Sequence, residues 1–223
     1  MCGRFTLSLE GRDELAAAIG VPVEQIPDSW NARYNIAPMQ RHFVVRQERE
    51  DRDLLVARWG LVNHWAKDNK RAGRQINARA ETVAERPAYR QAFTARRCVI
   101  PADGFYEWSG PKGARQPHWV HPHDDGLLLF AGLYESWQRE PDERETTFTI
   151  ITTEANALME PIHDRMPVIL SDDAADEWLF EETDAERLHA LLRPALDDLL
   201  TVRDASPLVN SVKNEGPELL AGG

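Results

Sequence analysis

The chain has 223 residues, of which 42% are hydrophobic, and a formal net charge of −11. This length suits one large domain, and the apolar fraction is sufficient for its core. No apolar run has membrane-spanning length, and charged residues such as Arg4, Glu10 and Arg12 interrupt the amino-terminal segment, so we expect neither a membrane protein nor a secretory leader. We therefore expect one domain over residues 1–223, in the cytoplasm and monomeric.

The predicted elements begin with a strand over residues 3–9, where Phe5, Leu7 and Leu9 alternate with polar residues. A helix over residues 10–19 follows, ended by Gly20. Strands at 42–46 and 54–59 surround a charged turn. Further strands are predicted at 97–100, 105–108, 118–121, 127–133, 147–152 and 168–170, and further helices at 85–94, 154–160, 173–180 and 184–192.

Short strands predominate in this series, and the helices fall between them irregularly. A doubly wound parallel sheet would require regular alternation of strands and helices, so it is excluded. Neither a linker nor a repeat divides the chain. The sequence therefore predicts an α+β fold, a single domain around a curved, barrel-like, mainly antiparallel sheet with peripheral helices.

The charge distribution matters more than the net charge. An excess of acids, 37 against 26 basic residues, argues against a nucleic-acid partner when taken alone. Residues 58–97, however, contain ten Lys or Arg and three acids, a local balance of +7. Such a segment in an acidic protein is typical of a phosphate-binding face, and equally of a solvated basic surface.

The only two cysteines, Cys2 and Cys98, form no disulfide framework. Cys98 lies in a strand-like run, where a free cysteine is usually a buried packing residue. Cys2 becomes the amino terminus if Met1 is removed, and then has an α-amine and a thiol on adjacent carbons. Together these groups convert an aldehyde into a thiazolidine ring. Their reference pKa values, about 8 and about 8.5, predict a reactive fraction of each near neutral pH.

Four polar residues in otherwise apolar or rigid segments are candidates for chemistry. Glu107 lies between Tyr106 and Trp108, and aromatic surroundings raise the pKa of a carboxyl, which suits a general acid. The alternative is a surface glutamate on an exposed strand face. His163 lies in a short loop between prolines and could act as an acid or base, or could be structural. Asn77 and Arg79 alternate on an extended segment, so both should point the same way, toward a phosphate or sugar hydroxyl.

Aromatic and histidine residues give weaker signals. Trp65, near basic residues, suits stacking on unpaired bases, whereas Trp59 ends an apolar strand and is expected in the core. His118, His121 and His123 lack a recognised ligand spacing, so we expect a solvated turn and no metal site. No cofactor-binding motif is present.

Seven ordered motifs together resemble the SOS-response-associated peptidase (SRAP) family nearly from end to end. They are residues 1–5, 33–38, 58–61, 76–81, 101–108, 162–167 and 209–216. The resemblance implies a single α+β domain around a barrel-like antiparallel sheet. It implies a protein that shields abasic sites in single-stranded DNA by cross-linking to them through the amino-terminal cysteine, and it leaves open associated lyase and autoproteolytic activities.

The resemblance also assigns roles to individual residues. Cys2 is implied as the cross-linking nucleophile, Asn77 as the residue that orients the opened sugar and the amino terminus, and Glu107 as the acid or base of sugar-ring opening. His163 is implied as the partner in Schiff-base formation and proton transfer. The implied DNA-binding residues are Arg4, Asn35, Pro38, Trp65, Arg79 and Arg86. Where the family usually has a proline, this chain has Asn63 and His64, so we expect a looser turn before Trp65.

Two other functions compete with this interpretation. A cysteine or amino-terminal-nucleophile peptidase would use Cys2 as nucleophile, with its own amine or His163 as base. A non-catalytic single-stranded DNA-binding protein would use the basic segment alone. The peptidase ranks second because the chain lacks the usual oxyanion-hole motifs.

Overall fold

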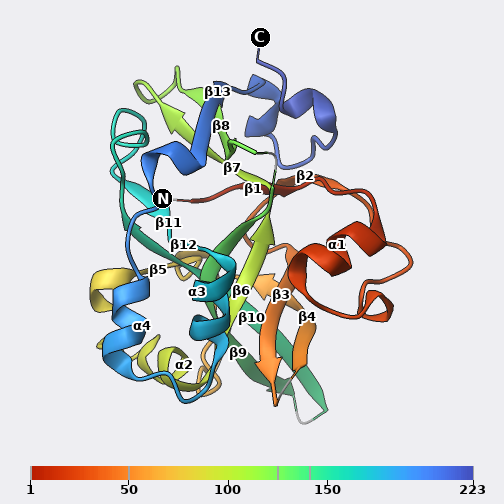
Figure 1. Cartoon of the computed structure of the whole chain (residues 1–223), viewed down its shortest axis with the longest axis vertical. Coiled ribbons are helices and arrows are strands. Elements are labelled where there is room, and N and C mark those ends of the chain that lie inside the picture. The colour runs from red at the N-terminus through yellow and green to blue at the C-terminus, as the bar shows by residue number, and fades with distance from the viewer. Residues whose placement is uncertain (1, 50, 125, 141, 223) are drawn as a thin grey trace.

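Two β-sheets and four peripheral α-helices make up the part of the protein that the structure describes (Figure 1). The computed structural model describes residues 2–49, 51–124, 126–140 and 142–222. Among these residues, no helix is long or apolar enough to cross a membrane. The α+β prediction is confirmed.

Five strands close into a barrel. They are β3 (Arg41–Glu48), β4 (Asp51–Trp59), β6 (Arg97–Ala102), β9 (Leu128–Glu140) and β10 (Glu143–Glu154). The order β10-β4-β3-β6-β9 returns to β10 because β9 and β10 also pair with each other. Only the pairing of β10 with β4 is parallel in this ring, so the predicted barrel-like, mainly antiparallel sheet is confirmed.

Three short strands extend the barrel sheet. β5 (Asn77–Arg79) pairs with β10 in parallel, and β11 (Arg165–Pro167) pairs with β10 in antiparallel orientation. β12 (Ile169–Leu170) pairs with β9. β10 is thus the strand on which segments from distant parts of the chain meet.

The second sheet is antiparallel throughout and has five strands in the order β13-β8-β7-β1-β2. Their bounds are β1 (Phe5–Leu7), β2 (Arg33–Ile36), β7 (Gly104–Ser109), β8 (Gln116–Pro122) and β13 (Leu200–Asp204). One face, with Phe5, Phe105 and Val120, joins the main core around the barrel. The other face, with Tyr106 and Trp119, packs in a smaller cluster against the carboxyl-terminal segment.

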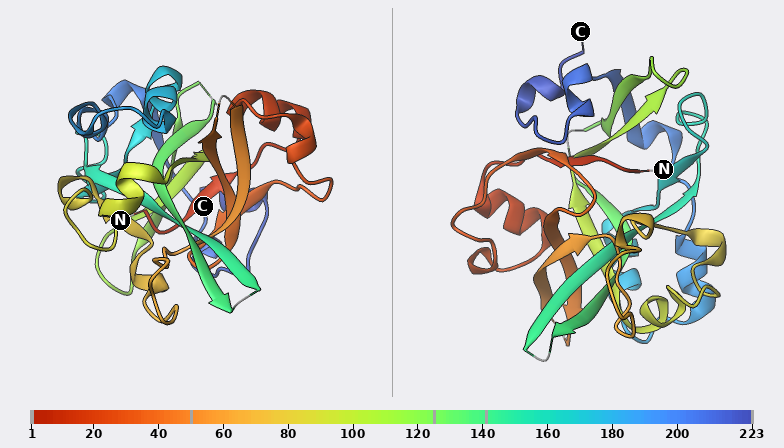
Figure 2. Two further views of the ribbon diagram at one scale, coloured as in Figure 1. Left: turned by 90° about the horizontal axis from the view of Figure 1, so that it is seen from below. Right: turned by 180° about the vertical axis from the view of Figure 1, so that it is seen from behind.

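The helices lie outside the sheets (Figures 1 and 2). They are α1 (Arg12–Ile19), α2 (Arg90–Ala95), α3 (Asp172–Leu179) and α4 (Ala185–Leu191), and short 3₁₀ turns lie at Val23–Gln25, Ala72–Arg74, Ala80–Thr82, Asp197–Leu199, Pro207–Asn210 and Pro217–Leu219. Gly20 ends α1 in the left-handed conformation (φ 69°), as its position in the sequence predicted.

Two helix predictions differ from the structure. The helix predicted at 85–94 begins only at Arg90, since Pro87 disfavours the helical conformation at the preceding Arg86. The helix predicted at 154–160 is wrong: β10 continues to Glu154, and turns follow. There the Asn156 side chain accepts a hydrogen bond from the Met159 amide (3.1 Å), which favours a local turn.

Candidate active site

Cys2 lies three residues before the start of β1, and it is completely buried. Burial raises the pKa of the Cys2 thiol well above its usual range, and the nearby Glu107 carboxylate raises it further. The expectation of a usable thiolate fraction at neutral pH is therefore wrong for this buried thiol. The sulfur is protonated and needs a base to act as a nucleophile.

Asn77 contacts Cys2 directly. Its side-chain Nδ2 donates a hydrogen bond to the Cys2 carbonyl oxygen (2.8 Å), and the Tyr89 hydroxyl donates to the Asn77 backbone carbonyl (3.2 Å). Asn77 Oδ1 is buried, and no donor reaches it from the residues that the structure describes. This amide oxygen is an acceptor that a substrate or an amino group could use.

Glu107 is buried on β7, with 3% of its surface exposed. Desolvation raises the pKa of its carboxyl to about 7, and the positive charge of the amino terminus offsets part of the rise. The alternative of a surface glutamate is excluded. A carboxyl with this pKa can donate or accept a proton at neutral pH.

His163 lies in the loop before β11, with its side chain 29% exposed. Its Nδ1 accepts a hydrogen bond from the Arg165 amide (3.0 Å) and also lies 2.9 Å from Asp164 Oδ1. Only a ring protonated at Nδ1 could donate to Asp164. Partial burial, and then the charge of the amino terminus, lower the pKa of His163, so we assign a neutral ring with its proton on Nε2.

Strand pairing brings these four residues together. Phe5 pairs with Phe105, and the Tyr106 amide donates to the Arg4 carbonyl (2.9 Å), so the segment that contains Cys2 runs beside Glu107. Thr152 of β10 pairs with Arg79 on one side and with Pro167 on the other. The strand with Asn77 and the loop with His163 therefore converge at the same end of β10.

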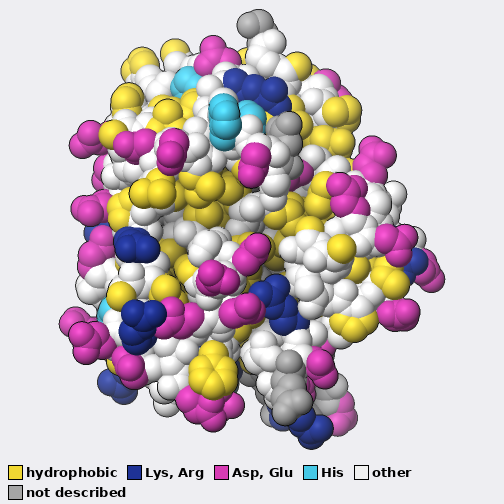
Figure 3. Space-filling view, in the orientation of Figure 1, with side chains coloured by type: hydrophobic (Ala, Val, Ile, Leu, Met, Phe, Trp, Pro, Cys, Tyr) yellow, Lys and Arg dark blue, Asp and Glu magenta, His cyan; other side chains and the backbone are white. Residues whose placement is uncertain are grey.

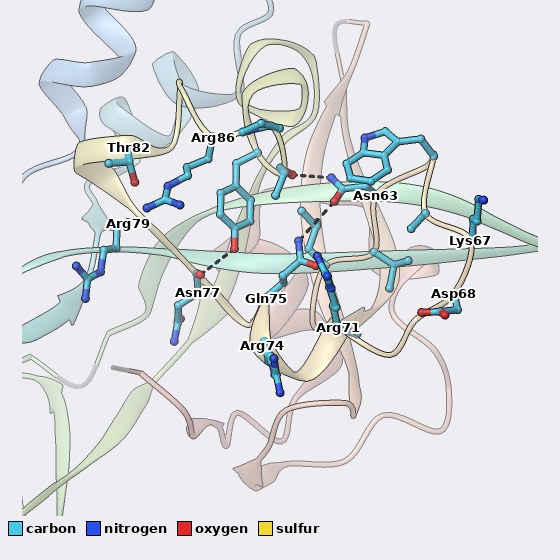
Figure 4. Close-up of a pocket in the computed structure, with 18 residues that line it drawn as sticks. Asn63, Lys67, Asp68, Arg71, Arg74, Gln75, Asn77, Arg79, Thr82 and Arg86 are labelled. Atoms are coloured by element: carbon cyan, nitrogen blue, oxygen red, sulfur yellow. Dashed lines mark hydrogen bonds between the residues drawn. The ribbon is translucent and has the colours of Figure 1, made fainter.

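A basic pocket of about 800 Å³ opens beside this cluster (Figure 4). Asn77 lines it, together with three of the predicted DNA-binding residues, Trp65, Arg79 and Arg86. Trp65 is 59% exposed, as a stacking surface requires, whereas Trp59 is fully buried as expected. The lining also contains cations and an aromatic residue that were not singled out from the sequence: Lys67, Arg71, Arg74 and Tyr89.

The other three predicted DNA-binding residues do not line this pocket. Arg4 Nη1 donates to Asn35 Oδ1 (2.6 Å) and to the Val209 carbonyl (2.8 Å). Asn35 is fully buried and donates to two carbonyls of the carboxyl-terminal segment. Pro38 lies half-buried in the turn between β2 and β3. The contacts of Arg4 and Asn35 therefore join β1 and β2 to the end of the chain.

Comparison with known proteins identifies the family. The sequence model of the family described as SOS response associated peptidase (SRAP) matches residues 1–212. This chain belongs to the SRAP family. Among relatives of this SRAP chain, abasic site processing protein YoqW of Bacillus subtilis is 43% identical over 99% of both chains. Abasic site processing protein HMCES of Rattus norvegicus is 30% identical over 99% of this chain and 76% of its own.

Solved structures share the fold of the SRAP chain. A crystal structure of a protein from Bacteroides thetaiotaomicron covers all of both chains with a TM-score of 0.89 at 24% identity. A phage-related protein from Bordetella bronchiseptica covers 91% of this chain and 93% of its own, with a TM-score of 0.69 at 29% identity. The first of these supports the fold alone.

Not every cation of the basic segment is available to a ligand in this SRAP protein. Arg58 forms a two-point ion pair with Glu145 (2.8 and 2.7 Å), and Arg96 binds the buried Glu135 (2.8 Å). Arg97 donates to backbone carbonyls at the end of α3. The local excess of positive charge is thus concentrated on the pocket by the fold, since the cations at the ends of the segment bind internal partners.

The turn before Trp65, where this SRAP chain departs from the usual proline, is fixed by side-chain contacts. Asn63 Nδ2 donates to the Ala88 carbonyl (2.6 Å), and the Val62 amide donates to Thr147 Oγ1 (2.9 Å). The Ala66 amide also donates to the Asn63 carbonyl (2.9 Å). These bonds replace the restraint that a proline would supply.

The three histidines near β8 do not converge. The ring of His121 stacks on Trp119 with centroids 4.2 Å apart and is 7% exposed, so the solvated turn expected there is wrong for this residue. His123 Nδ1 contacts Thr201 Oγ1 (3.2 Å), and His118 contacts Ser109 and Asp204. Among the described residues of this SRAP chain, no cluster of three His, Cys, Asp or Glu could hold a metal ion.

Arg115 is a residue of the SRAP site that sequence reasoning missed. It lies in the loop between β7 and β8, and its positive charge lowers the pKa of both Glu107 and His163, after the larger effects already named. The signal that could have found it is its position eight residues after Glu107, on a loop that contains two glycines with positive φ, Gly110 (88°) and Gly113 (96°). Such a hairpin returns to the strand pair that contains Glu107.

Proposed function

We propose that this SRAP protein processes abasic sites in single-stranded DNA, and that it shields them by a covalent thiazolidine cross-link through Cys2 after removal of Met1. The observation that carries the proposal is the hydrogen bond from Asn77 to the Cys2 carbonyl, because Asn77 also lines the basic pocket. It connects a candidate aldehyde-reactive terminus to a candidate DNA-binding surface. The relatives named as abasic site processing proteins support the same substrate.

The pocket would bind the strand beside the lesion. Five cations and one carboxylate line it, and arginine pairs well with phosphate oxygens. Trp65 supplies an exposed ring on which an unpaired base can stack. Electrostatic binding of this kind weakens as the salt concentration rises. It would bring the DNA strand to the pocket, and the covalent bond would then keep the protein on the lesion.

Glu107 would open the abasic deoxyribose ring. Ring opening moves one proton from the C1′ hydroxyl and delivers one to the ring oxygen, leaving an aldehyde. A carboxyl whose pKa is about 7 exists in both forms at neutral pH and can take part in either transfer. The free Oδ1 of Asn77 is a suitable acceptor for a hydroxyl of the opened sugar.

The cross-link would then form in two balanced steps. The α-amine of Cys2 adds to the aldehyde and water leaves, which gives an imine. The thiol adds to the imine carbon, its sulfur forms the new bond, and its proton is transferred to the imine nitrogen. Glu107 and His163 would move these protons, and this role is supported by the effect of the amino-terminal charge on the pKa of each. Ring closure removes the imine that would otherwise promote strand cleavage.

Intact-mass spectrometry tests this proposal directly. We expect the mature protein to lack the mass of Met1 and to gain the mass of an abasic single-stranded oligonucleotide less one water. Cys2→Ala and a form that retains Met1 should give no stable adduct, whereas the internal control Cys98→Ala, which replaces another buried cysteine, should react. A mature wild type without an adduct would contradict the proposal. Hydrolysis of unrelated peptides would favour the peptidase, and equal binding of intact and abasic strands without an adduct would favour the non-catalytic DNA-binding protein.

A further inference from the structure

A second histidine lies beside Glu107, in a cluster that the proposed chemistry does not use. His118 Nε2 is 2.7 Å from Ser109 Oγ, and His118 Nδ1 is 3.0 Å from Asp204 Oδ1. The His118 side chain is 15% exposed, whereas that of Asp204 is 62% exposed. The cluster thus connects a largely buried imidazole to solvent. In Figure 3, histidine side chains gather on the surface over β8 and β13.

Strand register places this cluster on the same face of the sheet as Glu107. Glu107 pairs with His118, and His118 pairs with Asp204, in adjacent antiparallel strands. Directly paired residues point to the same face, with their Cβ atoms about 5 Å apart. The neighbouring row on this face contains Phe105 and Val120, which pack in the main core. The polar row therefore faces the barrel side of the sheet, where Cys2 and Glu107 lie.

The partners of His118 determine which ring nitrogen has the proton. The Asp204 carboxylate only accepts, so Nδ1 of a neutral His118 donates to it, and Nε2 accepts from the Ser109 hydroxyl. Ser109 follows Glu107 by two residues on β7 and points to the same face. A hydroxyl that donates to Nε2 still has lone pairs for a second donor on that face, which protonated Glu107 can be.

We propose that His118 passes protons between solvent and Glu107, through Ser109 on the inner side and Asp204 on the outer side. This inference rests on the proposed function, in which a buried Glu107 must exchange protons several times during ring opening, imine formation and thiol addition. His118 is a positioning residue, because it acts through Glu107 and not on the substrate.

The transfer balances in both directions. The Glu107 proton moves to Ser109 Oγ while the Ser109 proton moves to His118 Nε2, which leaves a carboxylate and an imidazolium paired with Asp204. The Nδ1 proton then leaves to water, and the reverse sequence recharges Glu107. The charged groups near the path are the amino terminus and Arg115, both of which act on Glu107, and the neutral ring of His163 lies across the site. Arg203 lies on the opposite face, over the ring of Trp119 (4.3 Å).

The same residue types form the triad of serine hydrolases, but the arrangement differs in one respect. In the hydrolase triad the acid is buried and holds the histidine beside an exposed nucleophile. Here Asp204 is mostly exposed, and His118 lies beside a buried carboxyl. This geometry favours proton transfer to Glu107 over activation of Ser109.

Chemical rescue tests the proposal with the mature protein and abasic single-stranded DNA. His118→Ala should slow adduct formation at pH 7 on the order of tenfold, less than loss of a direct acid–base group. Added imidazole should restore most of the rate, and binding of intact single-stranded DNA should be unchanged. His123→Ala, a matched control at an exposed histidine next to β8, should behave as wild type. An unchanged rate in His118→Ala, or a loss that imidazole does not restore, would overturn the proposal.

Histidine ¹⁵N NMR of the free protein provides a test that needs no DNA chemistry. The ring of His118 should show the Nδ1–H tautomer, and Glu107→Gln should shift the ring ¹⁵N resonances of His118 at a fixed pH but leave those of His123 unchanged. Unchanged His118 signals in Glu107→Gln would overturn the proposed connection between His118 and Glu107. Labelling of Ser109 by a fluorophosphonate probe would also overturn the proposal, because it would show that Ser109 is a nucleophile. If the mature wild type forms no adduct, the proposed function fails, and the NMR result still decides whether His118 and Glu107 exchange protons.

Discussion

At the scale of single residues, burial decides the chemistry of the site. Cys2 and Glu107 are both removed from water, and in both cases desolvation is the main cause of a raised pKa. The thiol is thereby kept protonated, whereas the carboxyl is moved into the range where it exchanges protons at neutral pH. In the proposed function, the buried carboxyl would therefore supply the acid–base function that the buried thiol lacks.

Glu107 should make the stability of the protein depend on pH. Its pKa rises from 4.5 to about 7 on folding, so the folded state binds the proton more tightly than the unfolded state. The stabilisation is complete below the unfolded pKa and is lost as pH rises through the folded pKa, a difference of about 3 kcal/mol. Urea unfolding from pH 4.5 to 7.5 should show this fall in wild type relative to Glu107→Gln. Parallel curves for the two proteins would contradict a buried, proton-binding Glu107.

At the scale of elements, the segment from Leu61 to Tyr89 lines the pocket, and β10 holds part of this segment in place by pairing with β5. β10 pairs with β5 on one side and with β11 on the other. The loop that contains His163 is fixed further because the Arg165 guanidinium binds the Glu81 carboxylate (2.5 and 2.9 Å) and the Thr152 carbonyl (2.6 Å). β5 and β11 are short segments without a strong local strand preference. Both are held in place by β10, which lies about 70 residues after β5 in the chain.

The cations of this segment should differ in their contribution to DNA binding. Arg74→Ala and Arg86→Ala each remove a pocket cation, so each should reduce the slope of log K against log salt by about 0.7 for single-stranded DNA. Arg90→Ala is the matched control, because Arg90 is exposed on α2 and does not line the pocket. Fluorescence anisotropy at several salt concentrations measures these slopes. A reduction by Arg90→Ala equal to the other two would indicate a diffuse charge effect instead of a pocket.

At the scale of the whole molecule, the two sheets share one core. Phe5 and Phe105 of the five-stranded sheet contact Phe130 of the barrel, with ring centroids 6.1 and 6.0 Å apart. The net charge of −11 is distributed so that acidic side chains spread over the face drawn in Figure 3, while cations line the pocket. If the pocket binds DNA as proposed, the acidic surface elsewhere would repel DNA and so favour binding at the pocket.

This shared core predicts that residues 1–223 unfold as one unit. Tryptophans report on both sheets, since Trp59 and Trp137 belong to barrel strands and Trp108 and Trp119 to the five-stranded sheet. Tryptophan fluorescence and far-ultraviolet circular dichroism should therefore give coincident transitions in urea. Two separated transitions would show that the five-stranded sheet and the barrel are independent domains.

Local sequence patterns determined much of the fold. Alternation located β1, the charged turn between two strand-like runs located β3 and β4, and Gly20 located the end of α1, because these signals are properties of a few neighbouring residues. The ordered motifs were sufficient to indicate the SRAP family. β2, β11 and β13 were missed as strands, and β5 was expected only as an extended segment, since each has at most five residues and is defined by its partner strand.

The sequence by itself determined which residue types are present and in what order, and this was enough to single out Cys2, Asn77, Glu107 and His163. Only the tertiary structure decided that Arg4 binds Asn35 while Arg86 lines a pocket, that the Cys2 thiol is buried, and that His118 pairs with both Glu107 and Asp204. The physical reason is that charge and hydrogen-bonding capacity belong to the residue. Burial and partners are set by segments that can lie more than 100 residues apart in the chain, as Arg4 and Val209 do.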